Sequence, residues 1–77
     1  MDEINIALNS NNLESMAKLM GKYGDKESLF EGKNQKDEKI LISIFSQRII
    51  ILTFQTNGWI RKNIIHKDGT KEELFEK

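Results

Sequence analysis

The fold of this chain is decided by residues 39–66, which read KILISIFSQRIIILTFQTNGWIRKNIIH. This stretch contains most of the β-branched residues, the only tryptophan (Trp59) and no acidic residue. Its β-branched density predicts strands over residues 39–45, 49–55 and 59–66, because branched side chains favour the extended backbone of a sheet. The other segments are expected to cover or to extend the sheet that forms here.

The connection between the first two strands determines which side chains share a face of the sheet. A three-residue loop over residues 46–48 pairs Ile44 with Ile50. A two-residue loop shifts this register by one residue and mixes Ser43 into the apolar face, so we predict the three-residue loop. One face then collects six apolar side chains: Ile40, Ile42, Ile44, Ile50, Leu52 and Phe54.

The dipeptide Asn57-Gly58 is the strongest turn signal in the sequence. A three-residue loop over residues 56–58, with Gly58 in the left-handed conformation, pairs Phe54 with Ile60. A two-residue loop pairs Phe54 with Arg61 instead and leaves polar groups on the core face. We therefore predict the three-residue loop.

The C-terminal residues 67–77, KDGTKEELFEK, are compatible with two structures. Asp68-Gly69 indicates another hairpin turn, which makes residues 70–76 a strand beside residues 59–66. Alternatively, Thr70 followed by Glu73 has the spacing of a capping box, which makes the tail a helix. We favour the strand, because so short a helix at a chain end is marginally stable.

The N-terminal part of the chain is predicted to be helical. Residues 12–23 have an apolar stripe at helical spacing, made of Leu13, Met16, Ala17 and Met20. Asn11 is the expected cap, since Glu14 follows it at capping-box spacing, and Gly24 is expected just beyond the helix. Residues 2–9 are compatible with a short helix or a strand, and we favour the helix. Residues 28–31 are expected to form a short strand.

Together these elements predict an α+β fold in one domain that covers residues 1–77. One or two N-terminal helices, within residues 1–24, pack on a four- to five-stranded antiparallel β-meander over residues 28–77. A domain of 77 residues has a small core, so oligomerisation is an expected source of stability. The face predicted to lie under the helices consists of Ile40, Ile42, Ile44, Ile50, Leu52, Phe54, Ile60 and Ile64.

The composition argues against most enzyme classes. The chain has no cysteine and a single histidine, His66, so neither thiolate chemistry nor a typical zinc site is expected. Its five glycines do not cluster into a phosphate-binding loop. His66 lies near Asp68 in a turn, as solvated histidines usually do, and a strand at the tail would bring Glu72 or Glu73 beside it. We expect no catalytic residue, no cofactor and no metal, and predict that the protein is not an enzyme.

The sequence also indicates where the protein works. It begins MDEINIAL, without the pattern of a signal peptide, and its longest apolar runs, residues 40–42 and 49–52, are far too short to cross a bilayer. We expect a cytoplasmic protein without membrane contact. The absence of proline and the many isoleucine, asparagine and lysine residues are typical of AT-rich genomes, which suggests a bacterial or phage origin.

In this register the second sheet face is apolar at about half of its positions, more than a solvated face needs. Unless residues 1–9 or a loop cover it, we predict a docking surface with Trp59, Phe45, Arg61, Ile49 and Ile65 as partner-binding residues. The predicted function is a small non-catalytic binding module, a homodimer or a protein that docks a partner, such as a phage or prophage accessory protein. The predicted face consists of Leu41, Ser43, Phe45, Ile49, Ile51, Thr53, Trp59, Arg61, Asn63, Ile65 and Phe75.

An alternative function is the binding of single-stranded nucleic acid. Residues 39–67 carry five basic residues and no acid, and an aromatic ring beside basic side chains is typical of a base-stacking surface. The net charge of zero and the acids of the tail count against this function, because they repel phosphates. The residues expected to contact nucleic acid are Trp59, Arg61, Lys39 and Arg48.

Overall fold

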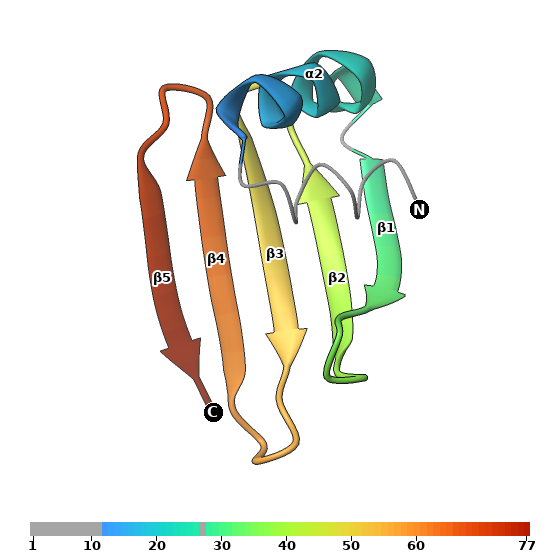
Figure 1. The fold of residues 1–77 in the computed structure, drawn as a ribbon, viewed down its shortest axis with the longest axis vertical. Helices are drawn as coiled ribbons and strands as arrows, with labels where there is room; N and C mark the ends of the chain where they lie inside the picture. The colour runs from blue at the N-terminus through green and yellow to red at the C-terminus, as the bar shows by residue number, and fades with distance from the viewer. Residues whose placement is uncertain (1–11, 27) are drawn as a thin grey trace.

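The computed structural model describes residues 12–26 and 28–77 of the chain. All five strands belong to one sheet, in which each strand pairs antiparallel with the next along the chain (Figure 1). The predicted α+β fold with a β-meander is confirmed, whereas the element predicted for residues 2–9 lies outside the described residues. The elements are the helix α2 (Leu13–Tyr23), the 3-10 turn η1 (Gly24–Lys26) and the strands β1 (Ser28–Lys33), β2 (Lys39–Ile44), β3 (Arg48–Phe54), β4 (Ile60–His66) and β5 (Lys71–Glu76).

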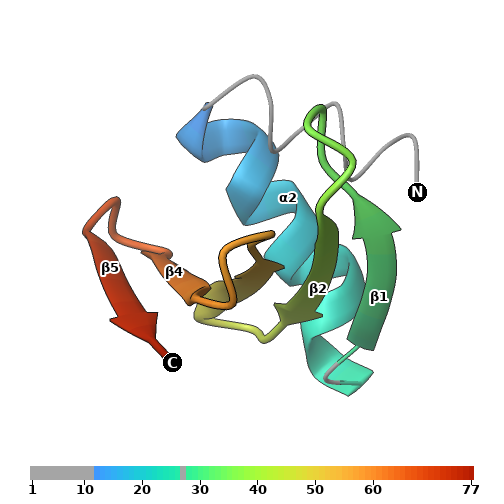
Figure 2. The ribbon, with the colours of Figure 1, turned by 90° about the horizontal axis from the view of Figure 1, so that it is seen from below.

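The tail of the chain is a strand, as the Asp68-Gly69 turn predicts. β5 pairs with β4 along its length, from Lys71 opposite Ile65 to Glu76 opposite Ile60. At the other side of the sheet, β1 pairs with β2 and is longer than the short strand expected over residues 28–31. β1 and β5 are therefore the two edges of the sheet, as the view along the strands shows (Figure 2).

Three of the four hairpins share one geometry. Each has a three-residue loop, and the residue before the loop donates its backbone N–H to the carbonyl of the residue after it. These hydrogen bonds run from Asn34 to Glu38 (3.0 Å), from Gln55 to Trp59 (3.0 Å) and from His66 to Thr70 (2.9 Å). The predicted loop over residues 56–58 and the pairing of Phe54 with Ile60 are confirmed.

The last residue of each of these loops has a positive φ. Two of them are glycines, Gly58 at 89° and Gly69 at 97°, which adopt this conformation without steric cost. The third is Asp37, whose φ is 64°. Aspartate tolerates the left-handed region better than most residues do, yet its Cβ still crowds the backbone there.

The β2–β3 hairpin contradicts the predicted register. Phe45 donates its backbone N–H to the carbonyl of Arg48 at 2.9 Å, so only two residues form the loop, and Ile44 pairs with Ile49 rather than with Ile50. The predicted three-residue loop was wrong because the four consecutive aliphatic residues 49–52 supply an apolar set for either register. The guanidinium carbon of Arg48 also lies 5.0 Å from the centre of the Phe45 ring, which holds the two ends of the tight turn together.

This register moves the predicted core residues to two different faces. Ile40, Ile42 and Ile44 face the helix, as predicted, and Ile49 joins them. The other five predicted core residues lie on the sheet face that points away from the helix. Directly paired residues of neighbouring strands share a face, and these five pair with one another or with other residues of that face. These five are Ile50, Leu52, Phe54, Ile60 and Ile64.

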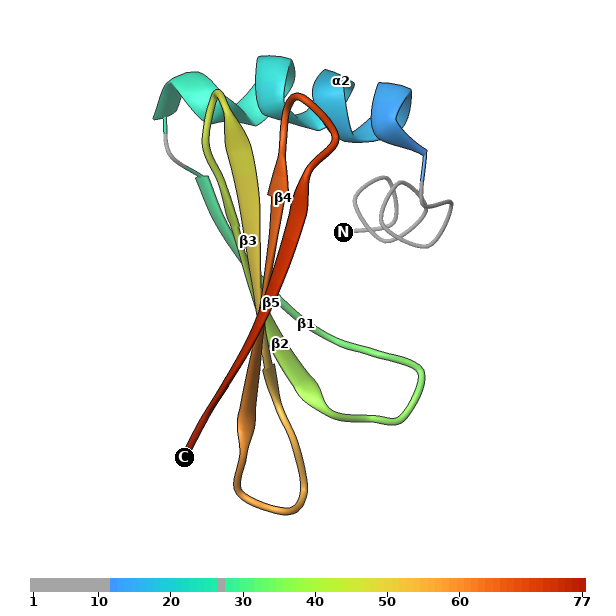
Figure 3. The ribbon, with the colours of Figure 1, turned by 90° about the vertical axis from the view of Figure 1, so that its left-hand side faces the viewer.

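Helix α2 begins one residue later than predicted. The side chain of Asn12, not Asn11, accepts the backbone N–H of Glu14 at 2.9 Å and caps the helix. The helix lies across one end of the twisted sheet rather than along its length (Figure 3). We call this the helix end of the sheet, and the opposite end the free end. No helix within the described residues is long and apolar enough to cross a membrane.

The core lies on one sheet face, which we call the helix-side face. It is packed under α2 at the helix end and extends along β2 to Ile40 near the free end. Of the predicted apolar stripe, Met16 and Met20 are buried, whereas Leu13 is 44% exposed. Leu19, which was not part of the predicted stripe, is buried with the two methionines. Tyr23 at the end of the helix contacts the ring of Phe30 on β1 edge to face, with ring centres 5.1 Å apart. The buried apolar residues are Met16, Leu19, Met20, Ile40, Ile42, Ile44, Ile49 and Ile65.

Gly24 joins the helix to the β2–β3 turn. Its backbone is helical, with φ of −66°, so the position does not need a glycine for its conformation. It needs one for space, because a Cβ atom here would lie 2.6 Å from both the Cα and the backbone nitrogen of Ser46. The absence of a side chain therefore lets the end of the helix contact the backbone of the turn directly.

We expect the substitution Asp37→Gly to raise the free energy of unfolding by about 0.5 kcal/mol, because it relieves the crowding at a positive φ. The ion pair that it removes, between Lys33 and Asp37 at 3.3 Å, is exposed and contributes little. The reciprocal change Gly58→Asp is expected to lower stability by about 1 kcal/mol. Urea unfolding of both variants measures the effects, and a loss of stability in Asp37→Gly would contradict the shared loop geometry.

We expect Gly24→Ala to destabilise the fold by about 1–3 kcal/mol, because the new methyl group forces the helix away from the turn. Gly21→Ala is the matched control. Gly21 lies in the same helix with open space around it, so alanine there is expected to stabilise the protein by about 0.5–1 kcal/mol. Opposite signs in thermal unfolding confirm the contact, whereas equal shifts would mean that the helix does not pack on the turn.

Candidate interaction surface

The predicted partner-binding residues do not form one surface. Ile49 is fully buried and Ile65 is 9% exposed, and both pack in the core beneath α2. The prediction that they lie on an open face opposite the helix is wrong. The two-residue β2–β3 turn shifts the register of β3 by one residue relative to the expected pairing, which moves Ile49 to the helix-side face. Phe45 stays near the surface, but at the helix end, where its ring contacts Arg48.

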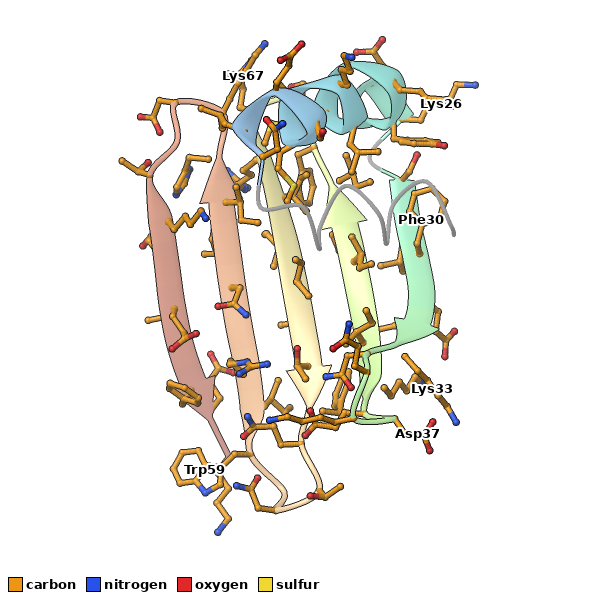
Figure 4. The ribbon with its side chains drawn as sticks, viewed as in Figure 1. Lys26, Phe30, Lys33, Asp37, Trp59 and Lys67 are labelled. Carbon is orange, nitrogen blue, oxygen red and sulfur yellow. The ribbon has the colours of Figure 1, made fainter. Side chains whose placement is uncertain are left out.

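Trp59 and Arg61 lie together at the free end of β4. Trp59 is 39% exposed, and the ammonium group of Lys77 lies 5.5 Å from the centre of its indole ring (Figure 4). Arg61 pairs across the strands with Phe75, which is 54% exposed. The Nε atom of Arg61 is buried without a hydrogen-bond partner within the described residues.

The four residues expected to contact nucleic acid are separated by the structure. Arg48 lies at the helix end of β3, at the opposite end of the sheet from Trp59. Lys39 is on the face opposite to Arg61 and forms an ion pair with Glu31 at 2.9 Å. The described residues therefore contain no continuous stacking surface made of Trp59 and these basic residues.

The sheet face opposite the helix is apolar at its centre, and we call it the outer face. Three cross-strand rows of this face span all five strands from β1 to β5, and the pair of Arg48 and His66 lies beyond them at the helix end. The rows are Leu29, Ser43, Ile50, Ile64 and Glu72 nearest the helix end, then Glu31, Leu41, Leu52, Lys62 and Leu74, then Lys33, Lys39, Phe54, Ile60 and Glu76 at the free end. Neighbours within a row are close enough for their side chains to touch.

The middle strand is apolar on the outer face from Ile50 through Leu52 to Phe54, and only its first residue there, Arg48 at the helix end, is charged. The apolar area reaches both edges of the sheet, because Leu29 on β1 is 65% exposed and Leu74 on β5 is 46% exposed. Five strands spaced about 4.8 Å apart and about 20 Å long cover roughly 500 Å². Eight of the fifteen side chains in the three rows are apolar, so the apolar part of this face covers roughly half of that area, and apolar patches of a few hundred Å² on monomeric proteins are often functional.

Charged residues surround this apolar centre unevenly. The free end of the β1–β2 edge carries Lys33 and Lys39, with Glu31 paired to Lys39. The β5 edge carries Glu72 and Glu76. The outer face thus has a basic corner at one edge and an acidic strand at the other.

The β4–β5 turn is held by polar contacts beside this acidic strand. Nε2 of His66 lies 2.6 Å from a carboxylate oxygen of Glu72, as the strand structure of the tail predicts. Asp68 accepts hydrogen bonds from the hydroxyl and the backbone N–H of Thr70. These two bonds, the hydroxyl first, lower the pKa of the Asp68 carboxyl below its usual value.

The described residues include a small pocket. A pocket of about 190 Å³ lies between α2 and the β4–β5 hairpin, and it is lined by Leu13, Met16, Ile65, Gly69 and Lys71. It is smaller than typical small-molecule sites, which span roughly 300–1,000 Å³. Within the described part of the chain, no three His, Cys, Asp or Glu side chains gather in a way that could hold a metal ion.

Comparison with known proteins returns no match, whether with protein families, curated proteins or solved structures. The arguments for a function therefore come from the outer face itself. Sequence reasoning predicted a second apolar face but assigned the wrong residues to it. The alternation of Ile50, Leu52 and Phe54 along β3 was visible in the sequence, but it was assigned to the core.

Proposed function

We propose that this protein is a small binding module without catalytic activity, which docks a protein surface through its outer face. The observation that carries the proposal is the run of three apolar side chains on β3, Ile50, Leu52 and Phe54, on the face away from the helix. An antiparallel sheet with one face in water normally alternates apolar and polar residues along each strand. β3 departs from this rule, because both of its faces are apolar between Ile49 and Leu52.

Because the observed register differs from the predicted one, the residues that we propose for partner binding differ from those predicted from the sequence. We propose Ile50, Leu52 and Phe54 as the centre of the docking surface, with Leu41 and Ile64 beside them. These five side chains are half-buried by their neighbours in the sheet, and each still presents surface to solvent. Removing such surface from water on docking is favourable, at about 25 cal/mol for each Å² of apolar area.

The mixed charges around this apolar centre support a protein partner rather than a phosphate backbone. Typical protein interfaces have an apolar core and a polar rim, as this face does. A nucleic-acid surface needs a positive field, but here Glu31 neutralises Lys39, and Glu72 and Glu76 lie along the β5 edge.

The variant Leu52→Lys tests whether the outer face is open. Because Leu52 points away from the core, we expect it to lower the free energy of unfolding by less than about 1 kcal/mol. The matched variant Ile49→Lys, on the same strand but fully buried, is expected to cost more than about 3 kcal/mol. Urea unfolding of dilute protein compares the two.

The same variants test for the apolar surface directly. The dye ANS fluoresces on exposed apolar protein surface, so folded, dilute parent protein is expected to enhance its fluorescence and Leu52→Lys to abolish most of that signal. A large loss of stability in Leu52→Lys, or dye binding that this variant leaves unchanged, would show that the outer face is covered and would rule out the proposed function.

A further inference from the structure

We infer that the occupant of the outer face is a second copy of this chain, packed face to face with a twofold axis parallel to β3. This inference rests on the function proposed above and names the partner. A twofold interface uses the same surface on both copies, so that surface must be complementary to itself. The outer face meets this condition in its shape, its apolar pattern and its charges.

The apolar pattern fits because β3 is the middle strand of five. An axis parallel to β3 places this strand over its own copy, so Ile50, Leu52 and Phe54 meet the same residues of the second copy. Two sheets that pack in this way lie about 10 Å apart, with their strands within about 30° of each other. The interface then has a continuous apolar centre along its axis from Ile50 to Phe54, with Arg48 beyond it at the helix end.

The charges fit because the axis exchanges the two edges of the sheet. β1 of one copy lies over β5 of the other, while the free ends of both copies stay on the same side. Lys33, at the free end of β1 (Figure 4), then faces Glu76 of the second copy, and the pair occurs twice by symmetry. The outer face is nearly balanced in charge, and the chain has twelve bases and twelve acids, so two copies do not repel each other overall.

The same arrangement gives Lys62, the lysine of the middle row, a carboxylate partner in the second copy. The axis places it over Leu41 of the second copy, next to Glu31 of that copy in the same row. The long lysine side chain can lie along the leucine while its ammonium group reaches the carboxylate. An axis perpendicular to the strands gives no such pairing. It would place β5 over β5 and bring Glu72 of one copy against Glu76 of the other.

The area of the face is sufficient for a dimer. The flat area of roughly 500 Å² from each copy gives about 1,000 Å² in total, which is the lower limit for specific protein interfaces. A chain of 77 residues, with eight buried apolar residues in the part that the structure describes, also gains from such an interface, since small domains have little stability of their own.

Sedimentation equilibrium of the folded, full chain over a range of concentrations tests the inference. We expect the parent to be a dimer and Leu52→Lys to be a folded monomer. The single charge reversals Lys33→Glu and Glu76→Lys are each expected to weaken the dimer on the order of tenfold, because each places like charges together twice. The double variant Lys33→Glu/Glu76→Lys is expected to restore the dissociation constant of the parent.

Glu73→Lys is the matched control for these reversals. Glu73 lies on β5 beside Glu72 but belongs to the helix-side face, so the same change of charge there is expected to leave the dimer unaffected. All three charged positions are exposed and lie on an edge strand, so their reversal leaves the fold intact, which circular dichroism verifies.

The outcomes separate this inference from the function on which it rests. A parent that stays monomeric at high concentration, while Leu52→Lys still removes dye binding, would overturn the second copy as occupant and leave the docking surface in place. A dimer that Leu52→Lys does not weaken would overturn this inference, and it would overturn the proposed function as well if that variant also left dye binding unchanged. A dimer that Leu52→Lys breaks, but that the double reversal does not restore, would overturn the proposed axis and with it this inference.

Discussion

The two-residue turn between β2 and β3 is the constraint on which the rest of the structure depends. In a strand, a shift of one residue moves every side chain to the other face. The hydrogen bond from Phe45 to Arg48 fixes this register, and Gly24 lets the helix rest directly on the backbone of the turn at Ser46. Through this turn, Ile49 enters the core while Ile50 and Leu52 remain on the outer face. Both the core and the candidate docking surface therefore follow from one tight connection.

The position of the helix explains why the protein has a second apolar face. α2 is short and lies across one end of the sheet, and it contributes only Met16, Leu19 and Met20 to the buried apolar residues of the described part of the chain. One helix of this length shields part of one sheet face. Within the described residues, Ile50, Leu52, Ile60 and Ile64 of β3 and β4 lie on the outer face, whereas Ile51 packs against the core. A surface of this kind favours association, because a small domain has few other ways to remove it from water.

The regular meander also organises the charges. Three hairpins with the same loop geometry keep neighbouring strands in step, so the residues of the outer face form straight cross-strand rows. Lysines of β1 and β2 thereby come to one corner of the sheet, while glutamates of β5 come to the opposite edge. A net charge of zero conceals this separation, because it sums charges without regard to where they lie. The separation of basic and acidic edges favours one orientation of a docked partner over others, which an apolar surface alone would not do.

The sequence by itself determined the elements whose cause is local. Asn57-Gly58 and Asp68-Gly69 specify their turns through the conformational freedom of glycine, so the β3–β4 pairing and the strand at the tail could be predicted. The helix over residues 12–23 and the α+β class followed from hydrophobic periodicity. Only the tertiary structure decided the face on which each residue of β3 lies, and with it the candidate site. Four consecutive aliphatic residues from Ile49 to Leu52 satisfy both registers equally, and Ser46-Gln47 carries no turn signal that would choose between them. The choice comes from contacts between distant segments: the packing of Met16 and Leu19 on Ile49, and the approach of Gly24 to Ser46.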